Sequence, residues 1–379
     1  MQLSQEDSLR LNVLLNQSLQ AVRIDEGKMI VYGLTEKGEA KIQLNPNCKD
    51  ELYVRRVKET LSSHVLGSPG GYPVFLKRWT RMGQARSESL ESLLKLGEPE
   101  AVVAVVGASG ITDEIARRAW WAMPNSDNAR RMLNREEVVQ GQMGPVLAEF
   151  LIEFLPFEEE PRNMIESVRL VLQPGLIDED ARLDLWKKAQ RKNAYLVGFL
   201  MSIPHDLPQE AVEHSQFAEW DSQLQSLAKQ GNTLANTLRQ MLTAAGQAYL
   251  KTVDTVLKKP ANQDVVVALF ESFETYFSAI RPHNEKRREI DQILNEATQF
   301  CTTPDSCVYR SHIEQLLETI PDARPLLESL FVLSCVGEQL VAPIFARTDA
   351  VGSVMRRKLE PVVTPLTQHI NQLSGKASN

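Results

Sequence analysis

The feature that most constrains this chain is a change in the spacing of its apolar residues. Between residues 20 and 44, apolar and β-branched side chains alternate with polar ones, which is typical of strands with one buried face. From Ser87 onward, apolar residues recur every three or four positions, and a Gly or Pro interrupts most of these helical stretches. A chain of this kind must bury itself by packing many helices together.

The alternating region predicts a small α+β unit over residues 1–86. Strands are expected at Gln20–Ile24, Met29–Leu34 and Ala40–Leu44, separated by two short turns that each contain a glycine. Asp50 then stands where a helix cap is expected, and apolar residues at helical spacing follow it to about residue 65. The first unit is therefore predicted to be a three-stranded antiparallel meander plus a helix.

The helical region divides into two expected segments. Residues 87–203 predict a stack of short helices with HEAT-like character, although the sequence has no repeat of fixed length. Pro204 and Pro208 stop one helix and allow another to begin near Gln209, and longer apolar stripes then predict a bundle of longer helices over 204–379. The expected helices are 87–96, 98–107, 111–123, 126–133, 143–155, 161–172, 178–202, 221–258, 262–281, 284–299, 309–319 and 323–345. The predicted fold class is mainly α.

Charge and composition restrict the partners and the compartment. The chain has 379 residues and a net charge of −7, which disfavours general binding to nucleic acid or to an anionic membrane. Its apolar runs fall far short of the roughly 20 residues that cross a bilayer, and its first residues do not resemble a secretory signal. Four cysteines in so long a chain do not make a disulfide framework. We therefore expect a cytoplasmic protein with reduced thiols and no membrane insertion.

Several common catalytic motifs are missing from the sequence. It contains no G-x-G-x-x-G, no G-x-x-x-x-G-K-[ST], no H-E-x-x-H, no G-x-S-x-G and no C-x-x-C. The frequent routes to nucleotide binding, zinc hydrolysis, serine hydrolysis and thiol exchange are therefore not indicated. The sequence favours a protein that is not an enzyme, and it predicts no cofactor.

The most distinctive local feature is a basic, aromatic and glycine-rich segment over residues 70–86. Its candidate partner-binding residues are Tyr72, Lys77, Arg78, Trp79, Arg81 and Arg86. Such a segment can seat an acidic partner, or it can stack bases and hold phosphates. It can also dock internally, with its arginines against the three carboxylates Glu158–Glu160. We favour such internal docking over nucleic-acid binding, and the residues above are the candidates should the segment bind a partner protein.

Two groups of residues are weak candidates for metal binding. Glu210 and His214 would lie one turn apart on the helix expected from Gln209, and glutamate and histidine are residue types that bind metal ions. The surrounding stretch 204–222 has only acidic charges, so a solvated acidic face or a docking surface is the alternative. The second group is Cys301, Cys307 and His312, whose spacing is wider than in common zinc sites. Buried thiols in a helical corner are the alternative there.

Five segments of the chain resemble one known family. They are residues 66–83, 97–106, 117–122, 158–175 and 191–198. These segments resemble the DsrS-like proteins, which are encoded with the dissimilatory sulfite reductase system of sulfur-oxidising bacteria. The resemblance extends over roughly residues 10 to 205. It implies a cytoplasmic accessory or regulatory component of sulfur oxidation, and it supplies no catalytic residue.

The resulting expectation is an accessory protein of sulfur oxidation that acts through protein–protein contacts. One alternative is a sulfur-handling protein that carries persulfide, or a metal-binding protein, with Cys301 and Cys307 as the functional residues. The other alternative is an RNA-binding regulator that uses the basic aromatic segment 70–86.

Overall fold

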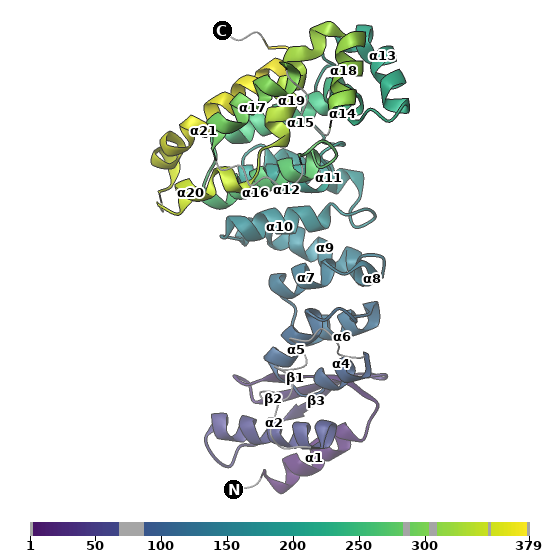
Figure 1. Cartoon of the computed structure of the whole chain (residues 1–379). Helices are drawn as coiled ribbons and strands as arrows, with labels where there is room; N and C mark the ends of the chain where they lie inside the picture. The colour runs from purple at the N-terminus through teal and green to yellow at the C-terminus, as the bar shows by residue number, and fades with distance from the viewer. Residues whose placement is uncertain (1–2, 68–86, 283–288, 303–308, 348–349, 377–379) are drawn as a thin grey trace. The chain divides into compact units, whose positions relative to one another are not determined.

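The structure, a computed structural model, is mainly helical and has a small antiparallel sheet near its N-terminus (Figure 1). Helices account for 67% of the residues, so the predicted fold class is confirmed. The described residues are 3–67, 87–282, 289–302, 309–347 and 350–376. They form two compact units: unit 1 comprises Met1–Pro156 and Gln173–Ile177, and unit 2 comprises Phe157–Leu172 and Asp178–Asn379.

Unit 1 begins with the sheet and its helices. Its elements are α1 (Gln5–Leu15), β1 (Leu19–Asp25), β2 (Ile30–Thr35), β3 (Gly38–Gln43), α2 (Asp50–Leu66), α4 (Ser87–Leu93), α5 (Pro99–Val106), α6 (Asp113–Ala122), α7 (Ser126–Leu133), α8 (Glu136–Val139) and α9 (Met143–Phe154). The 3-10 turn η1 (Leu155–Phe157) follows where the chain passes into unit 2.

Unit 2 is helical throughout its described residues. Its elements are α10 (Pro161–Val171), α11 (Glu179–Ala189), α12 (Asn193–Ser202), α13 (Phe217–Lys229), α14 (Thr233–Leu242), α15 (Ala244–Lys258), α16 (Gln263–Tyr276), α17 (Ile290–Thr302), α18 (Arg310–Thr319), η3 (Pro321–Ala323), α19 (Arg324–Ser334), η4 (Glu338–Leu340), α20 (Ala342–Phe345) and α21 (Gly352–Leu373).

The expected meander is present, with strand order β1-β2-β3 and both pairs antiparallel. Side chains such as Val22, Val31 and Ile42 pack with α1 and α2 in one apolar core. On β1, the Val22 amide donates to the Leu94 carbonyl at 2.8 Å, and Gly97 lies against Ile24. The segment after α4 therefore belongs to the same unit as the sheet, because these contacts join them.

The first helix, α1, was not expected from the sequence. Ser4 caps it by accepting a hydrogen bond from the Asp7 amide at 3.2 Å. Asp7 is fully buried, and its Oδ2 accepts from the Tyr53 hydroxyl at 2.5 Å and from the Asn45 amide at 2.8 Å. These bonds tie α1 to α2. The prediction that Asp50 caps α2 was wrong, because Lys49 occupies the cap position and Asp50 is the first helical residue.

Three long helices expected from the sequence, 178–202, 221–258 and 323–345, are divided in the structure, the last of them into α19, η4 and α20. The stretch 178–202 forms α11 and α12, which fold back on each other with Trp186 edge-on to Phe199 at 4.9 Å. The stretch 221–258 lies in α13, α14 and α15. Gly231, with φ of +91°, ends α13, and Thr243 caps α15 by accepting from the Gly246 amide at 3.2 Å. Most helices of unit 2 are therefore shorter than the sequence predicted.

The longest helix, α21, has 22 residues and carries no prediction from the sequence. Pro361 and Pro365 lie inside it, and a proline removes a helical hydrogen bond. Neither ring lies on the buried side of the helix, so the lost bonds do not disturb the packing against α15 and α19. The buried side carries an apolar stripe with helical spacing: Met355, Leu359, Val362, Leu366, Ile370 and Leu373.

The two units do not coincide with the three segments expected from the sequence. The proposed boundary at Pro204–Pro208 lies within unit 2, because α12 packs against α15 and α16 on the other side of it. The chain instead divides after Pro156, with a short return of residues 173–177 to unit 1. There the Gln173 side chain donates to the Leu133 carbonyl at 2.9 Å.

Across the described ranges, no helix has both the length and the apolar character required to cross a bilayer.

Close packing of α10 against α12 gives a test of the fold. A Cβ atom at Gly198 would lie 2.6 Å from the Cβ of Val168 and 3.0 Å from the Ile165 carbonyl. We expect Gly198→Ala to lower the free energy of unfolding by about 1–3 kcal/mol, measured by thermal and urea denaturation. Gly107→Ala is the control, since a Cβ there meets nothing closer than 3.4 Å. Equal stability of the two variants would contradict the packing.

Candidate functional site

The expected partner-binding residues Tyr72, Lys77, Arg78, Trp79, Arg81 and Arg86 all lie outside the described residues. The same holds for the proposed docking of segment 70–86 onto Glu158–Glu160, because one side of that contact is not described. These residues therefore stay a prediction from the sequence.

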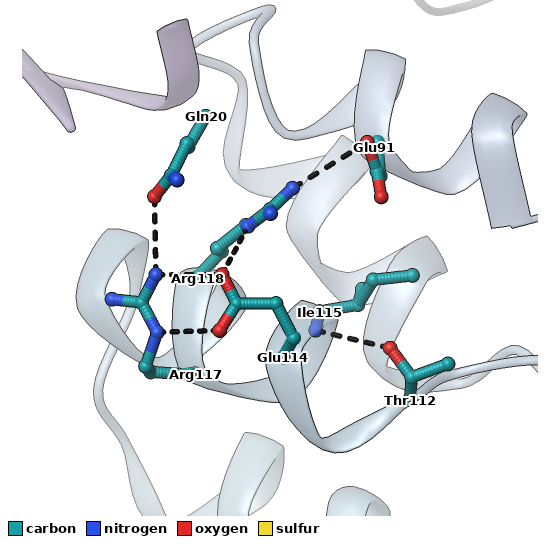
Figure 2. A network of polar contacts seen from close by, with 7 residues as sticks. All are labelled: Gln20, Glu91, Thr112, Glu114, Ile115, Arg117 and Arg118. Carbon is teal, nitrogen blue, oxygen red and sulfur yellow. Dashed lines mark hydrogen bonds and ion pairs between the residues drawn. The ribbon is translucent and has the colours of Figure 1, made fainter. Parts of the chain in front are cut away.

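A polar network surrounds the first turns of α6 in unit 1 (Figure 2). Glu114 accepts two hydrogen bonds from Arg117, at 2.7 and 2.8 Å, and one from Arg118 at 2.8 Å. Arg118 also pairs with Glu91 of α4 at 3.4 Å, and Arg117 donates to Gln20 of β1 at 3.0 Å. The network therefore ties α6 both to α4 and to the sheet.

A second set of contacts joins α6 to the sheet. The Arg23 guanidinium lies 4.6 Å from the ring centre of Tyr32 and 4.9 Å from that of Trp121. Glu39 accepts from both Arg23 and Trp121 at 3.0 Å. Because each cation in these two networks has a carboxylate partner, we interpret them as structural ties that hold the sheet against α6.

The α6 network predicts a pH dependence of stability. Hydrogen bonds from Arg117 and then Arg118 lower the pKa of Glu114 from 4.5 to about 2, although burial opposes them. A carboxyl with a lowered pKa stabilises the fold above pH 4.5, and this stabilisation is lost as the pH falls toward 2. We expect Glu114→Gln to melt at a lower temperature than wild type at pH 7, with the difference shrinking in acid.

The control for that comparison is Glu100→Gln. Glu100 lies in the first turn of α5, as Glu114 lies in the first turn of α6, but it has no ion-pair partner among the described residues. A melting difference that is the same for both variants, or that persists unchanged in acid, would refute the role of the arginines.

The expected geometry of Glu210 and His214 was wrong. Residues 203–216 contain no helix, so these two residues do not lie one turn apart on a helix face. His214 is buried against Gly375, and its Nδ1 accepts from the Gln216 amide at 3.2 Å. Burial lowers the pKa of His214. Glu210 is exposed. The prolines ended α12 as predicted, but the next helix begins only at Phe217.

The second metal candidate is described only in part. Cys307 and the side chain of Cys301 lie outside the described residues. His312 Nδ1 lies 3.3 Å from the Thr233 hydroxyl, and the His312 carbonyl accepts from Asn232 at 2.9 Å. Within the part of the chain that is described, no three His, Cys, Asp or Glu side chains come together to hold a metal ion. The metal site stays a prediction.

The side chains of two cysteines are described, and neither forms a disulfide. Cys48 is half-buried beside the core of unit 1, and its sulfur lies 3.7 Å from the Lys49 carbonyl. Cys335 is buried just after α19. Neither is brought next to a second described cysteine.

Unit 2 contains an open groove of about 730 Å³. It lies where α10 and α16 pack against α12 and against each other, with η4 at its edge. Its apolar lining consists of Ile165, Met201, Val267 and Ala268. Its polar lining consists of Arg162, Asn163, Glu166, Gln263, Asp264, Glu271 and Glu338. Three segments that are far apart in the sequence therefore contribute carboxylates to one groove.

Negative charge in the groove is only partly neutralised. Glu166 pairs with Arg169 at 2.7 Å. Burial raises the pKa of Glu271, and the charges of Glu338 and Glu274 raise it further, while Arg162 acts in the opposite direction. Burial is the largest cause of this raised pKa, and the smaller contribution of the neighbouring carboxylates indicates a negative potential at Glu271. The groove therefore attracts cations, and its apolar floor can hold the stem of a long side chain.

The sequence analysis did not identify this groove. Asp264, Val267 and Glu271 have the spacing of one helix face, which is a signal within α16. Nothing in the sequence indicates that Glu166 and Glu338, about one hundred residues before and seventy residues after α16, line the same space.

Comparisons with protein-family models, with curated protein sequences and with solved structures found no match to this chain.

Proposed function

We propose that this chain is an accessory or regulatory protein that acts through protein–protein contacts, and that its groove in unit 2 binds a basic segment of a partner. The resemblance to DsrS-like proteins supports a partner in the cytoplasmic sulfur-oxidation machinery. The basic aromatic segment 70–86 would provide a second contact, of opposite charge, in the same assembly.

The observation that carries this proposal is the acidic groove, whose negative charge is only partly neutralised. Asp264, Glu271 and Glu338 face a common space that contains a single cation, Arg162. A Lys or Arg side chain can place its charged end among these carboxylates while its methylene groups cover Val267 and Ala268. Because the groove is open to solvent, a segment of a partner has access to it.

The groove is tested with a labelled peptide that alternates lysine and alanine. We expect the triple variant Asp264→Asn/Glu271→Gln/Glu338→Gln to bind it about tenfold more weakly than wild type, because three negative charges are removed from the groove. Fluorescence anisotropy provides the measurement. The matched control is Asp291→Asn/Glu318→Gln/Asp322→Asn, which removes three exposed carboxylates outside the groove. Equal losses in the two variants would show that the groove has no special role.

The pH dependence of peptide binding follows from Glu271. Its raised pKa means that it takes up a proton at a higher pH than an ordinary carboxyl. A bound cation favours the ionised form, so affinity should fall as the pH is lowered toward that pKa. We expect Glu271→Gln to bind more weakly at neutral pH and to lose part of this pH dependence. An unchanged pH profile would contradict the assignment.

Segment 70–86 is tested by affinity capture from sulfur-grown cells. We expect Lys77→Ala/Arg78→Ala/Arg81→Ala to lose a partner that wild type retains, while its melting temperature stays near that of wild type. Retained sulfur-oxidation proteins support the proposed pathway. A large loss of stability in this variant would instead indicate that the segment serves internal packing.

A further inference from the structure

The first turns of α21 carry an exposed basic cluster. Arg356, Arg357 and Lys358 are consecutive and exposed, and none has an ion-pair partner among the described residues. The only carboxylate of α21 is Glu360. This is unusual in a chain with a net charge of −7.

Apolar side chains lie beside these cations. Because a helix turns by about 100° per residue, Val354, Arg357, Lys358 and Pro361 share one side of α21. Val354 is 46% exposed, and Val351, at the cap position, is 67% exposed. We call Val351, Val354, Arg357, Lys358 and Pro361 the α21 face. It lies opposite the stripe that packs against α15 and α19.

Cations near the start of a helix do not stabilise the helix itself. The N-terminal end of a helix has a positive potential, so cations near it are unfavourable and acidic residues are favourable. The first turn of α21 has no acidic residue, and no side chain caps it. The three cations of the second turn therefore add to the positive potential of the helix end, and Glu360 is the one carboxylate of α21 that opposes them.

We propose that the α21 face binds an acidic segment of a partner protein. Carboxylates of that segment would pair with Arg357 and Lys358, and an apolar side chain would pack on Val351 and Val354. The partner is assigned by charge complementarity. The α21 face has no aromatic side chain on which a base could stack, so an acidic protein segment fits it better than a nucleic acid.

This inference goes beyond the groove, since the two surfaces prefer ligands of opposite charge. The groove lies on α10, α16 and η4, and it shares no residue with the α21 face. Unit 2 would then present one surface for a basic segment and another for an acidic one, which is a suitable arrangement for a protein that joins two partners.

The test uses a labelled peptide with glutamates and leucines at helical spacing. We expect Arg357→Glu/Lys358→Glu to weaken binding about tenfold or more, because two attractive charges become repulsive. Val354→Ser should weaken binding less than this charge reversal does. Peptide binding by Val354→Ser should still depend on the salt concentration, because Arg357 and Lys358 are unchanged. The same charge reversal at Lys229→Glu/Lys259→Glu, two exposed lysines elsewhere in unit 2, is the control and should have little effect.

The melting temperature distinguishes a role of the α21 face in binding from a role in stabilising the fold. Glutamates near the start of α21 suit the helix potential, so Arg357→Glu/Lys358→Glu should melt at or above the wild-type temperature. A lower melting temperature with unchanged peptide binding would overturn the inference. So would a single-stranded oligonucleotide that binds at least as tightly and responds to the same variants. The groove variant should still bind the acidic peptide, so the two proposals fail independently.

Discussion

The surfaces of unit 2 depend on how closely α10 approaches α12. Gly198 of α12 has no side chain at the point where Val168 of α10 packs against it. The Val168 side chain can therefore contact the α12 backbone directly. Because α12 also packs against α16, the approach brings Glu166 of α10 into the same space as Asp264 and Glu271 of α16. The close approach at Gly198 thus contributes to the packing of the three helices that line the acidic groove.

The charged groups of the two units serve different purposes. In unit 1, Arg23, Arg117 and Arg118 all have carboxylate partners, and their contacts hold the sheet and α6 together. In unit 2, Glu271 and Glu338 of the groove and the cations of α21 are exposed and have no ion-pair partner among the described residues. A charge that is not used to stabilise its own fold is available to a partner, which is the physical basis of both proposals.

Local patterns predicted much of the fold. The three strands and most of the helices between residues 87 and 172 lie close to where the apolar spacing and the Gly and Pro stops placed them. Helix α21 was not predicted although its apolar stripe is regular, and Pro361 and Pro365 are residues that the sequence pattern treats as helix stops. Their positions away from the buried side, which only the packing reveals, explain why the helix continues. The breaks near Gly231 and Thr243 are likewise set by the folding back of α13, α14 and α15.

The sequence by itself determined the class of this protein: a short meander, and then helices that must bury their apolar stripes against one another. It also located the basic segment 70–86, since that cluster is contiguous in the chain. Only the tertiary structure decided the sites in unit 2. The groove combines residues from α10, α16 and η4, and Glu210 and His214 were separated because the chain between Ile203 and Gln216 is not helical. The spacing of apolar residues indicates which side of a helix is buried, but it does not indicate which helices pack against one another.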